Sequence, residues 1–216
     1  MSEEKLTSEL IVTGKQNYGE SSLIVNALSP DFGKLDFIIR GARKQGVKHY
    51  GCIDICSLYE FSFKFREAGL IPVYSYELAA DFSGIGANYE LFAAVGGLLN
   101  FVNGNCQPMI PQPGTFACLG NILLRAAAGC GRSEFLMFEV TLMLTFLYEN
   151  GFLPDALDAD EEVSNRKYMK IIEIIQSGES RFENMVRINA AGWEALRQWA
   201  NSLLTYHGLK GLSLNS

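Results

Sequence analysis

Four cations gather in a glycine-bearing segment that directly follows a strand-like run. Arg40, Arg43, Lys44 and Lys48 lie close together, and no carboxylate stands among them. Cations grouped in this way on a β scaffold can neutralise phosphates, because each one that displaces a condensed counterion gains free energy. A solvated loop is the alternative, since short charge runs usually face water. The segment therefore indicates either a polynucleotide contact or a solubilising loop.

The chain around this segment is acidic. It has 216 residues, with 18 Lys and Arg against 24 Asp and Glu, for a net charge of −6. Residues 1–80 hold nine basic and ten acidic residues, so the remainder carries −5 of that total. The field of the whole molecule repels nucleic acid, and any affinity must come from a local patch. A hydrophobic content of 48% is enough for a packed core.

Two loops approach the phosphate-binding pattern G-x-x-x-x-G-K-[ST] without completing it. After Gly14–Gly19, Glu20 stands where the pattern needs lysine, and after Gly41–Gly46 the corresponding residue is Val47. Neither loop leads into a helical pattern. Nucleotide hydrolysis is therefore not expected.

Metal-binding and catalytic patterns are also missing from the sequence. Cys52 and Cys56 are four residues apart on one expected strand, and two thiols at that spacing do not converge on a tetrahedral metal. The two histidines, His49 and His207, have no partner at ligand spacing. No residues assemble a nucleophile, a base and an oxyanion site. We predict a binding protein that is not an enzyme and has no metal or cofactor.

The cysteines and the longest apolar run bear on location. Five cysteines without a shared short spacing do not resemble a disulfide framework and are typical of a reducing compartment. Phe135–Tyr148 is shorter than the roughly 20 residues of a membrane span. No secretory signal is evident. The expected location is the cytoplasm, at the nucleoid, without a membrane partner.

The elements that must position the cations are strands in the first part of the chain. Alternation of apolar and polar residues predicts them, and Gly14–Gly19 is expected to break the chain between the first two. A turn is expected at residues 29–33, which contain Pro30 and Gly33. Five short strands favour a small antiparallel barrel. The expected strands are Leu6–Thr13, Ser22–Leu28, Lys34–Arg40, Ile53–Phe65 and Val73–Ala80.

From residue 88 onward the spacing of apolar residues becomes helical. Ser133 is expected to cap one helix start, and Gly151 to end that helix. The change of period at Asp81–Ala87 predicts domains at 1–82 and 83–216 in an α+β chain. The expected helices are Tyr89–Val102, Phe116–Ala128, Glu134–Glu149, Asn165–Ser177 and Ala190–His207.

Motifs in a fixed order along the whole chain resemble the bacterial recombination mediator family RecO. The quoted segments are Ile11-Val12, Tyr18–Ser22, Ile24-Val25, Phe32–Lys34, Arg40–Lys44, Phe138-Glu139, Gly151-Phe152, Pro154-Asp155 and Leu204–Leu214. The resemblance implies an N-terminal OB-fold followed by a helical domain. It further implies a role in recombinational repair: binding single- and double-stranded DNA, annealing strands, and helping to load recombinase onto strands coated by single-strand-binding protein. A RecR-type protein and the C-terminal tail of single-strand-binding protein are the implied partners.

One departure from the family concerns zinc. Many members carry a cysteine cluster just after the Pro-Asp turn, whereas residues 156–163 of this chain contain no cysteine. The remaining cysteines precede the turn. We therefore expect no zinc.

The first functional hypothesis is strand binding and annealing on the barrel. Besides the four cations, Lys15 and Lys34 would extend the track if the first and third strands lie side by side. Tyr18 and Tyr59 are candidate platforms for base stacking. By their spacing, the phenylalanines at 61, 63 and 65 are expected to face the barrel interior.

Two other hypotheses remain open. In the second, the protein is an adaptor whose helical half docks an acidic and apolar peptide, with little DNA affinity of its own. Arg125, Arg132, Lys167 and Lys170 are the candidate rim residues, and ordinary surface charge is the alternative for each. In the third, the barrel is an RNA- or oligosaccharide-binding module, which leaves the long helical half without a role.

Overall fold

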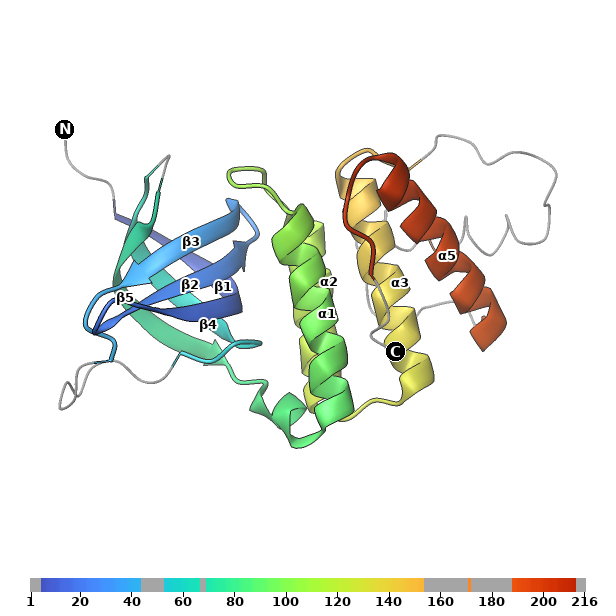
Figure 1. Ribbon diagram of the computed structural model, residues 1–216, viewed down its shortest axis with the longest axis horizontal. Coiled ribbons are helices and arrows are strands. Elements are labelled where there is room, and N and C mark those ends of the chain that lie inside the picture. Colours follow the sequence, from blue (N-terminus) through green and yellow to red (C-terminus); the bar gives the residue numbers. More distant parts are fainter. Residues whose placement is uncertain (1–4, 44–52, 67–68, 154–170, 172–187, 213–216) are drawn as a thin grey trace.

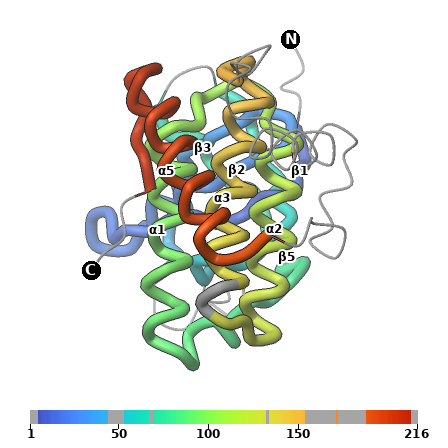
Figure 2. The backbone as a smooth tube through the Cα atoms, turned by 90° about the vertical axis from the view of Figure 1, so that its right-hand side faces the viewer, coloured from blue at the N-terminus to red at the C-terminus, as the bar shows by residue number. Residues whose placement is uncertain are grey.

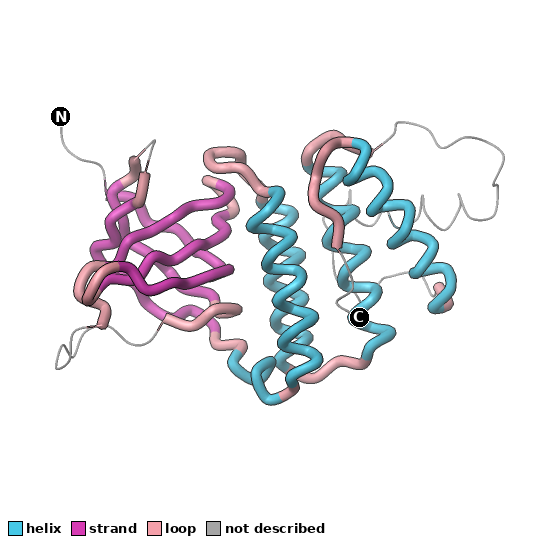
Figure 3. Tube along the Cα trace, in the orientation of Figure 1, coloured by secondary structure: helices cyan, strands magenta, loops and turns pink. Residues whose placement is uncertain are grey.

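The molecule places a β-barrel at one end and a stack of helices at the other. The computed structural model describes residues 5–43, 53–66, 69–153, 171 and 188–212. Figure 1 and Figure 3 show the strands gathered on one side, followed by a layer of two helices and then a second helical layer. The predicted helix at Asn165–Ser177 lies, except for residue 171, outside the described residues.

Five strands close into a barrel with the order β1-β2-β3-β5-β4. All neighbouring pairs are antiparallel except β3 and β5, which pair in parallel over two residues. This is the five-stranded OB-type barrel expected from the sequence, and that prediction is confirmed. The strands are β1 (Lys5–Tyr18), β2 (Ser22–Ser29), β3 (Gly33–Ile39), β4 (Leu58–Lys64) and β5 (Ile71–Ala80).

Strand β1 is longer than predicted, because Gly14 does not break it. The strand pairs with β4 over Lys5–Ile11 and with β2 over Ile11–Tyr18, with a register shift between Val12 and Gly14. Such a bulge bends a strand without ending its pairing. A Cβ atom at Gly14 would lie 2.9 Å from Oδ1 of Asn26, so glycine permits the close approach. The predicted break at Gly14–Gly19 was wrong for this reason.

The barrel interior is aromatic. Phe37, Phe61 and Phe63 are fully buried and form edge-to-face ring contacts with centroids 5.0 and 5.2 Å apart. The expectation that Phe61 and Phe63 face inward is confirmed, and Phe65 is partly buried at the edge of this cluster. Tyr59 is only 4% exposed, and its hydroxyl accepts a hydrogen bond from the Asp54 backbone N–H at 3.0 Å. Tyr59 therefore cannot stack on a base, and that prediction was wrong.

The helical part follows a short 3₁₀ helix at Ser83–Ala87. Figure 2, seen from the helical end, shows α3 and α5 in front of α1 and α2. None of the described helices is both long and apolar enough to cross a membrane. The helices are α1 (Tyr89–Asn105), α2 (Pro113–Ala127), α3 (Arg132–Glu149) and α5 (Ala190–Tyr206).

The two ends of α3 test two capping predictions. The helix begins at Arg132 with Gly131 at the N-cap position, so the predicted cap at Ser133 was wrong. At the other end Gly151 has φ +70°, and the backbone N–H of Phe152 donates to the Leu147 carbonyl at 2.8 Å. This is the left-handed C-terminal cap expected of a glycine.

The outer face of the barrel packs into the hydrophobic core of the helices, which is separate from the core inside the barrel. Ile11 and Leu28 point outward from the barrel and belong to the cluster formed mainly by α1, α2 and α3. The turn between β2 and β3 also docks on the α1–α2 connection through backbone hydrogen bonds. These run from Lys34 N–H to the Gln107 carbonyl at 3.2 Å, from Met109 N–H to the Phe32 carbonyl at 2.9 Å and from Gln112 N–H to the Pro30 carbonyl at 3.0 Å.

Two helix-associated cysteines are expected to resist thiol reagents in the folded protein. Burial, the largest cause, raises the pKa of Cys106 and of Cys118 to about 12 each. Because the thiolate is the reactive form, both should react far more slowly with Ellman's reagent at pH 8 than in denaturant. Ionisation of the unfolded thiols, whose pKa is 9.0, lowers stability above that pH until the folded thiols also ionise. Rapid labelling of either thiol in the native protein would contradict this expectation.

Candidate nucleic-acid interface

Two of the four predicted cations lie at the end of the barrel away from the helices. Arg40 and Arg43 follow β3, and both residues are exposed. Gly41 between them has φ +72°, as expected for a glycine that turns the chain after a strand. Lys44 and Lys48 lie outside the described residues. We call Arg40–Arg43 together with the β1–β2 hairpin the lip of the barrel.

Arg43 is held against the β1–β2 hairpin by two hydrogen bonds. Its backbone N–H donates to the Ser21 carbonyl at 3.0 Å, and its Nη1 donates to the Gly19 carbonyl at 3.2 Å. One guanidinium nitrogen is used in this way, and the residue as a whole is exposed. The hairpin therefore fixes the position of the cation while leaving donors for an anionic ligand.

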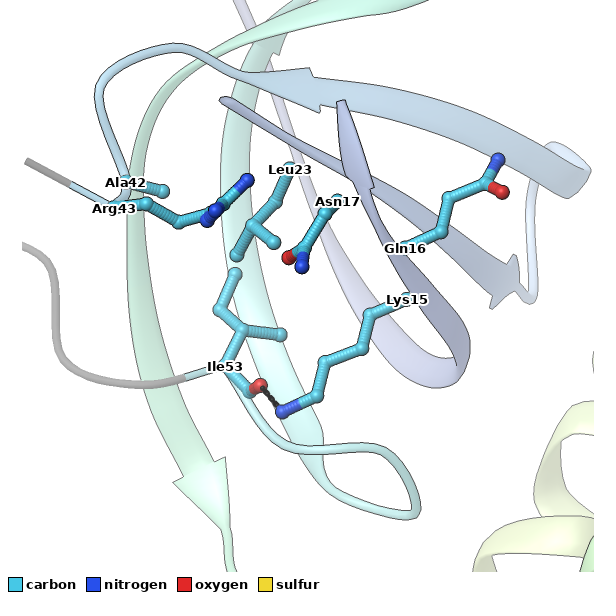
Figure 4. Close-up of a pocket in the computed structure, with 7 residues that line it drawn as sticks. All are labelled: Lys15, Gln16, Asn17, Leu23, Ala42, Arg43 and Ile53. Carbon is cyan, nitrogen blue, oxygen red and sulfur yellow. Dashed lines mark hydrogen bonds between the residues drawn. The ribbon is translucent and has the colours of Figure 1, made fainter. Parts of the chain in front are cut away.

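A cavity of about 370 Å³ opens at this lip. Figure 4 shows the side chains of Arg43, Asn17 and Lys15 around it, with apolar side chains between them. The bulge at Gly14 explains why Lys15 lies here: after it, Lys15 pairs with the interior residue Val25 and so faces inward. The residues around the cavity are Lys15, Gln16, Asn17, Leu23, Ala42, Arg43 and Ile53.

Lys15 is already engaged at the cavity. Its Nζ donates to the Ile53 carbonyl at 2.7 Å and to Oδ1 of Asp54 at 3.1 Å. Asp54 is more exposed than Lys15, so solvent weakens this ion pair. The ammonium group would therefore attract a phosphate less strongly than an unpaired cation would.

The predicted track through Lys15 and Lys34 depended on a pairing that does not occur. Strand β2 lies between β1 and β3, because the three strands follow one another through two antiparallel hairpins. Lys34 instead reaches α1, where its Nζ donates to the Asn103 carbonyl at 2.9 Å. The expectation that the first and third strands are neighbours was wrong.

Tyr18 is the predicted aromatic platform that the structure leaves available. It ends β1, pairs with Ser22 across the hairpin and is 52% exposed. Sequence reasoning did not single out Asn17 or Leu23, which pair with each other across the hairpin and line the cavity. Their inward direction depends on the bulge, which the sequence alternation alone does not reveal.

Of the four predicted peptide-binding cations, one has a described side chain. Arg125 forms an ion pair with Glu134 at 2.8 Å, on the surface between α2 and α3. The backbone of Arg132 begins α3, but its side chain, together with Lys167 and Lys170, lies outside the described residues. A peptide-binding rim made of these residues stays a prediction.

The described residues hold no group of three or more His, Cys, Asp or Glu side chains placed to bind a metal ion. The ring of His207 packs against Phe152, with centroids 4.5 Å apart. Within this part of the chain, Cys56, Cys106 and Cys118 are buried free thiols. The zinc question outside these ranges stays a prediction.

Comparison with known proteins gives two matches. Residues 1–82 match the family model described as "Recombination protein O N terminal". The chain is also 26% identical over 149 residues to the DNA repair protein RecO of Thermodesulfovibrio yellowstonii. That alignment covers 69% of this chain and 58% of the relative, so it spans less than two thirds of the relative's length.

Proposed function

We propose that the chain is a member of the RecO family, because residues 1–82 match the model of that family's N-terminal part, and that it binds DNA strands at the lip of the barrel during recombinational repair. In this role it acts without catalysing a reaction. It anneals complementary strands and helps to load recombinase onto strands coated by single-strand-binding protein. Its partners are then DNA, a RecR-type protein and the C-terminal tail of the coating protein.

The observation that carries this proposal is the pair of exposed guanidinium groups at the lip. Within the described ranges, neither Arg40 nor Arg43 forms an ion pair with a carboxylate. An unpaired cation can gain free energy by displacing a counterion from a phosphate. An annealing protein also needs contacts to the backbone that leave the base edges free to pair. Arginines at an open barrel end meet both requirements.

The proposal predicts a strongly salt-dependent affinity for single-stranded DNA. Four phosphate contacts, from Arg40, Arg43, Lys44 and Lys48, give a log–log slope near −3, at about 0.7 per contact. The measurement is a salt titration of a labelled oligonucleotide by fluorescence anisotropy. A flat response would show that these cations do not contact phosphates. An annealing assay with and without coating protein tests the mediator role separately.

The alternative function is that of a protein adaptor with weak DNA affinity. The charge of −5 on residues 81–216 favours it, because this part of the chain repels a polyanion. In that case residues 83–216 form a domain that docks an acidic and apolar peptide, while residues 1–82 form a second domain. Binding of a peptide from the tail of single-strand-binding protein, without binding of an oligonucleotide, would select the adaptor.

A further inference from the structure

We infer that the cavity at the barrel lip holds one unpaired nucleobase of the bound strand, with the adjoining phosphate on Arg43. This inference rests on the proposed function, since it needs a DNA strand at the lip. It adds an enclosed base-binding site to the phosphate contacts at the lip. Three features of the cavity carry it: apolar walls, an exposed amide with no partner among the described residues, and one cation with no carboxylate partner there.

The walls of the cavity suit the flat apolar faces of a base. Leu23, Ala42 and Ile53 line it, and Ile53 is only 1% exposed, so its side chain is fixed in the barrel core. The volume of about 370 Å³ falls at the small end of the range for pockets that bind small molecules. Apolar walls set around a few polar groups are typical of such pockets.

The amide of Asn17 supplies the polar recognition group. It projects into the space between Leu23, Ile53 and Lys15 (Figure 4). It has no hydrogen-bond partner within the part of the chain that the structure describes. A primary amide offers two donors and one acceptor oxygen. Base edges present donors and acceptors side by side, and an amide can pair with both.

The charges at the cavity match one phosphate. Lys15 is partly neutralised by Asp54 and is bonded to the Ile53 carbonyl. Arg43 uses Nη1 for the Gly19 carbonyl and has no carboxylate partner among the described residues. A ligand with one negative charge beside a base, which is one nucleotide unit of a strand, therefore fits better than a triphosphate.

The test compares strands with and without a base. A labelled 12-residue deoxyadenylate strand and an abasic strand of equal length carry the same phosphates. The abasic strand is expected to bind about fivefold more weakly, since covering one face of a base with the apolar walls removes enough apolar surface from water for about that factor. Equal affinities would overturn the inference and leave phosphate binding intact. Failure of both strands to bind would overturn the proposed function itself.

Two variants locate the effect in the cavity. Asn17→Ala is expected to reduce the difference between the two strands to less than about twofold, with the loss confined to the strand that carries bases. Ala42→Phe, which fills the cavity, should do the same. The matched control is Asn100→Ala, the same change at an exposed position of α1 that does not line the cavity. An unchanged difference in both cavity variants, with native melting curves, would contradict the inference.

A competition experiment separates a strand from a free nucleotide as the source of the base. Deoxyadenosine monophosphate in large excess is expected not to displace the labelled strand, because the strand adds contacts at the other cations of the lip. Displacement at concentrations near those of the strand would show a mononucleotide site and would overturn the inference.

Discussion

Replacing Arg40 and Arg43 by glutamate should weaken binding to single-stranded DNA by about 25-fold or more at 0.1 M salt. Each phosphate contact on a single strand contributes about 0.7 to the log–log slope, which is about 0.7 log units of affinity at 0.1 M salt. Two lost contacts therefore remove about 1.4 log units, and the new carboxylates add repulsion. The slope itself should fall by about 1.4. Fluorescence anisotropy over a salt series measures both quantities.

A matched variant separates the local patch from the overall charge. Arg125→Glu with Lys210→Glu changes the net charge by the same amount, but both residues belong to the helical half and are exposed there. This variant should keep the affinity within about twofold, since exposed charges more than a Debye length away are largely screened. Equal losses in the two double variants would show that total charge, and not the lip, governs DNA affinity.

Gly33→Val should destabilise the folded protein by about 3 kcal/mol or more. Gly33 has φ +62°, a conformation that costs a β-branched residue on the order of 1–3 kcal/mol. A Cβ atom there would also collide with the backbone carbonyl oxygens of Gln107 and Ile110 in the α1–α2 connection. The Gln107 carbonyl accepts a hydrogen bond from the Lys34 N–H and so cannot move aside cheaply. Urea unfolding followed by circular dichroism gives the free energy of unfolding.

Gly96 provides the control for this prediction. It lies within α1, and a Cβ atom added there meets no other atom within 4 Å. Gly96→Ala should therefore stabilise the protein by about 0.5–1 kcal/mol, because glycine loses more backbone entropy in a helix. If Gly33→Val cost less than about 1 kcal/mol, the β2–β3 turn would not be locked against the helices as described.

The sequence predicts the barrel and the described helices because both depend on local periodicity. Alternation along β3 and β4 correctly places Phe61 and Phe63 inside, and apolar spacing correctly places α1 and α3. The turn that contains Pro30 and Gly33 is also predictable from local sequence, because proline and glycine set or free backbone angles through their own covalent structure.

The errors come from effects that reach across the chain. The bulge at Gly14 reverses which residues of β1 face inward, so Lys15 and Asn17 enter the cavity instead of the outer surface. The Tyr59 hydroxyl accepts a hydrogen bond from the backbone N–H of Asp54 in the loop before β4, a contact that no spacing rule identifies. The predicted track from Lys15 to Lys34 fails because β2 lies between β1 and β3. This strand order depends on pairing across the whole sheet and not on local periodicity.

The contact between barrel and helices also constrains how any strand transfer can work. Ile11 and Leu28 are buried in the same cluster as the helices, and the β2–β3 turn is bonded to the α1–α2 connection. A hinge at this seam would have to expose both side chains and break those bonds at once. We therefore expect the barrel and the layer of α1 and α2 to move as one rigid body. Under the proposed function, a DNA strand bound at the lip is therefore not brought toward the helices by bending at this seam.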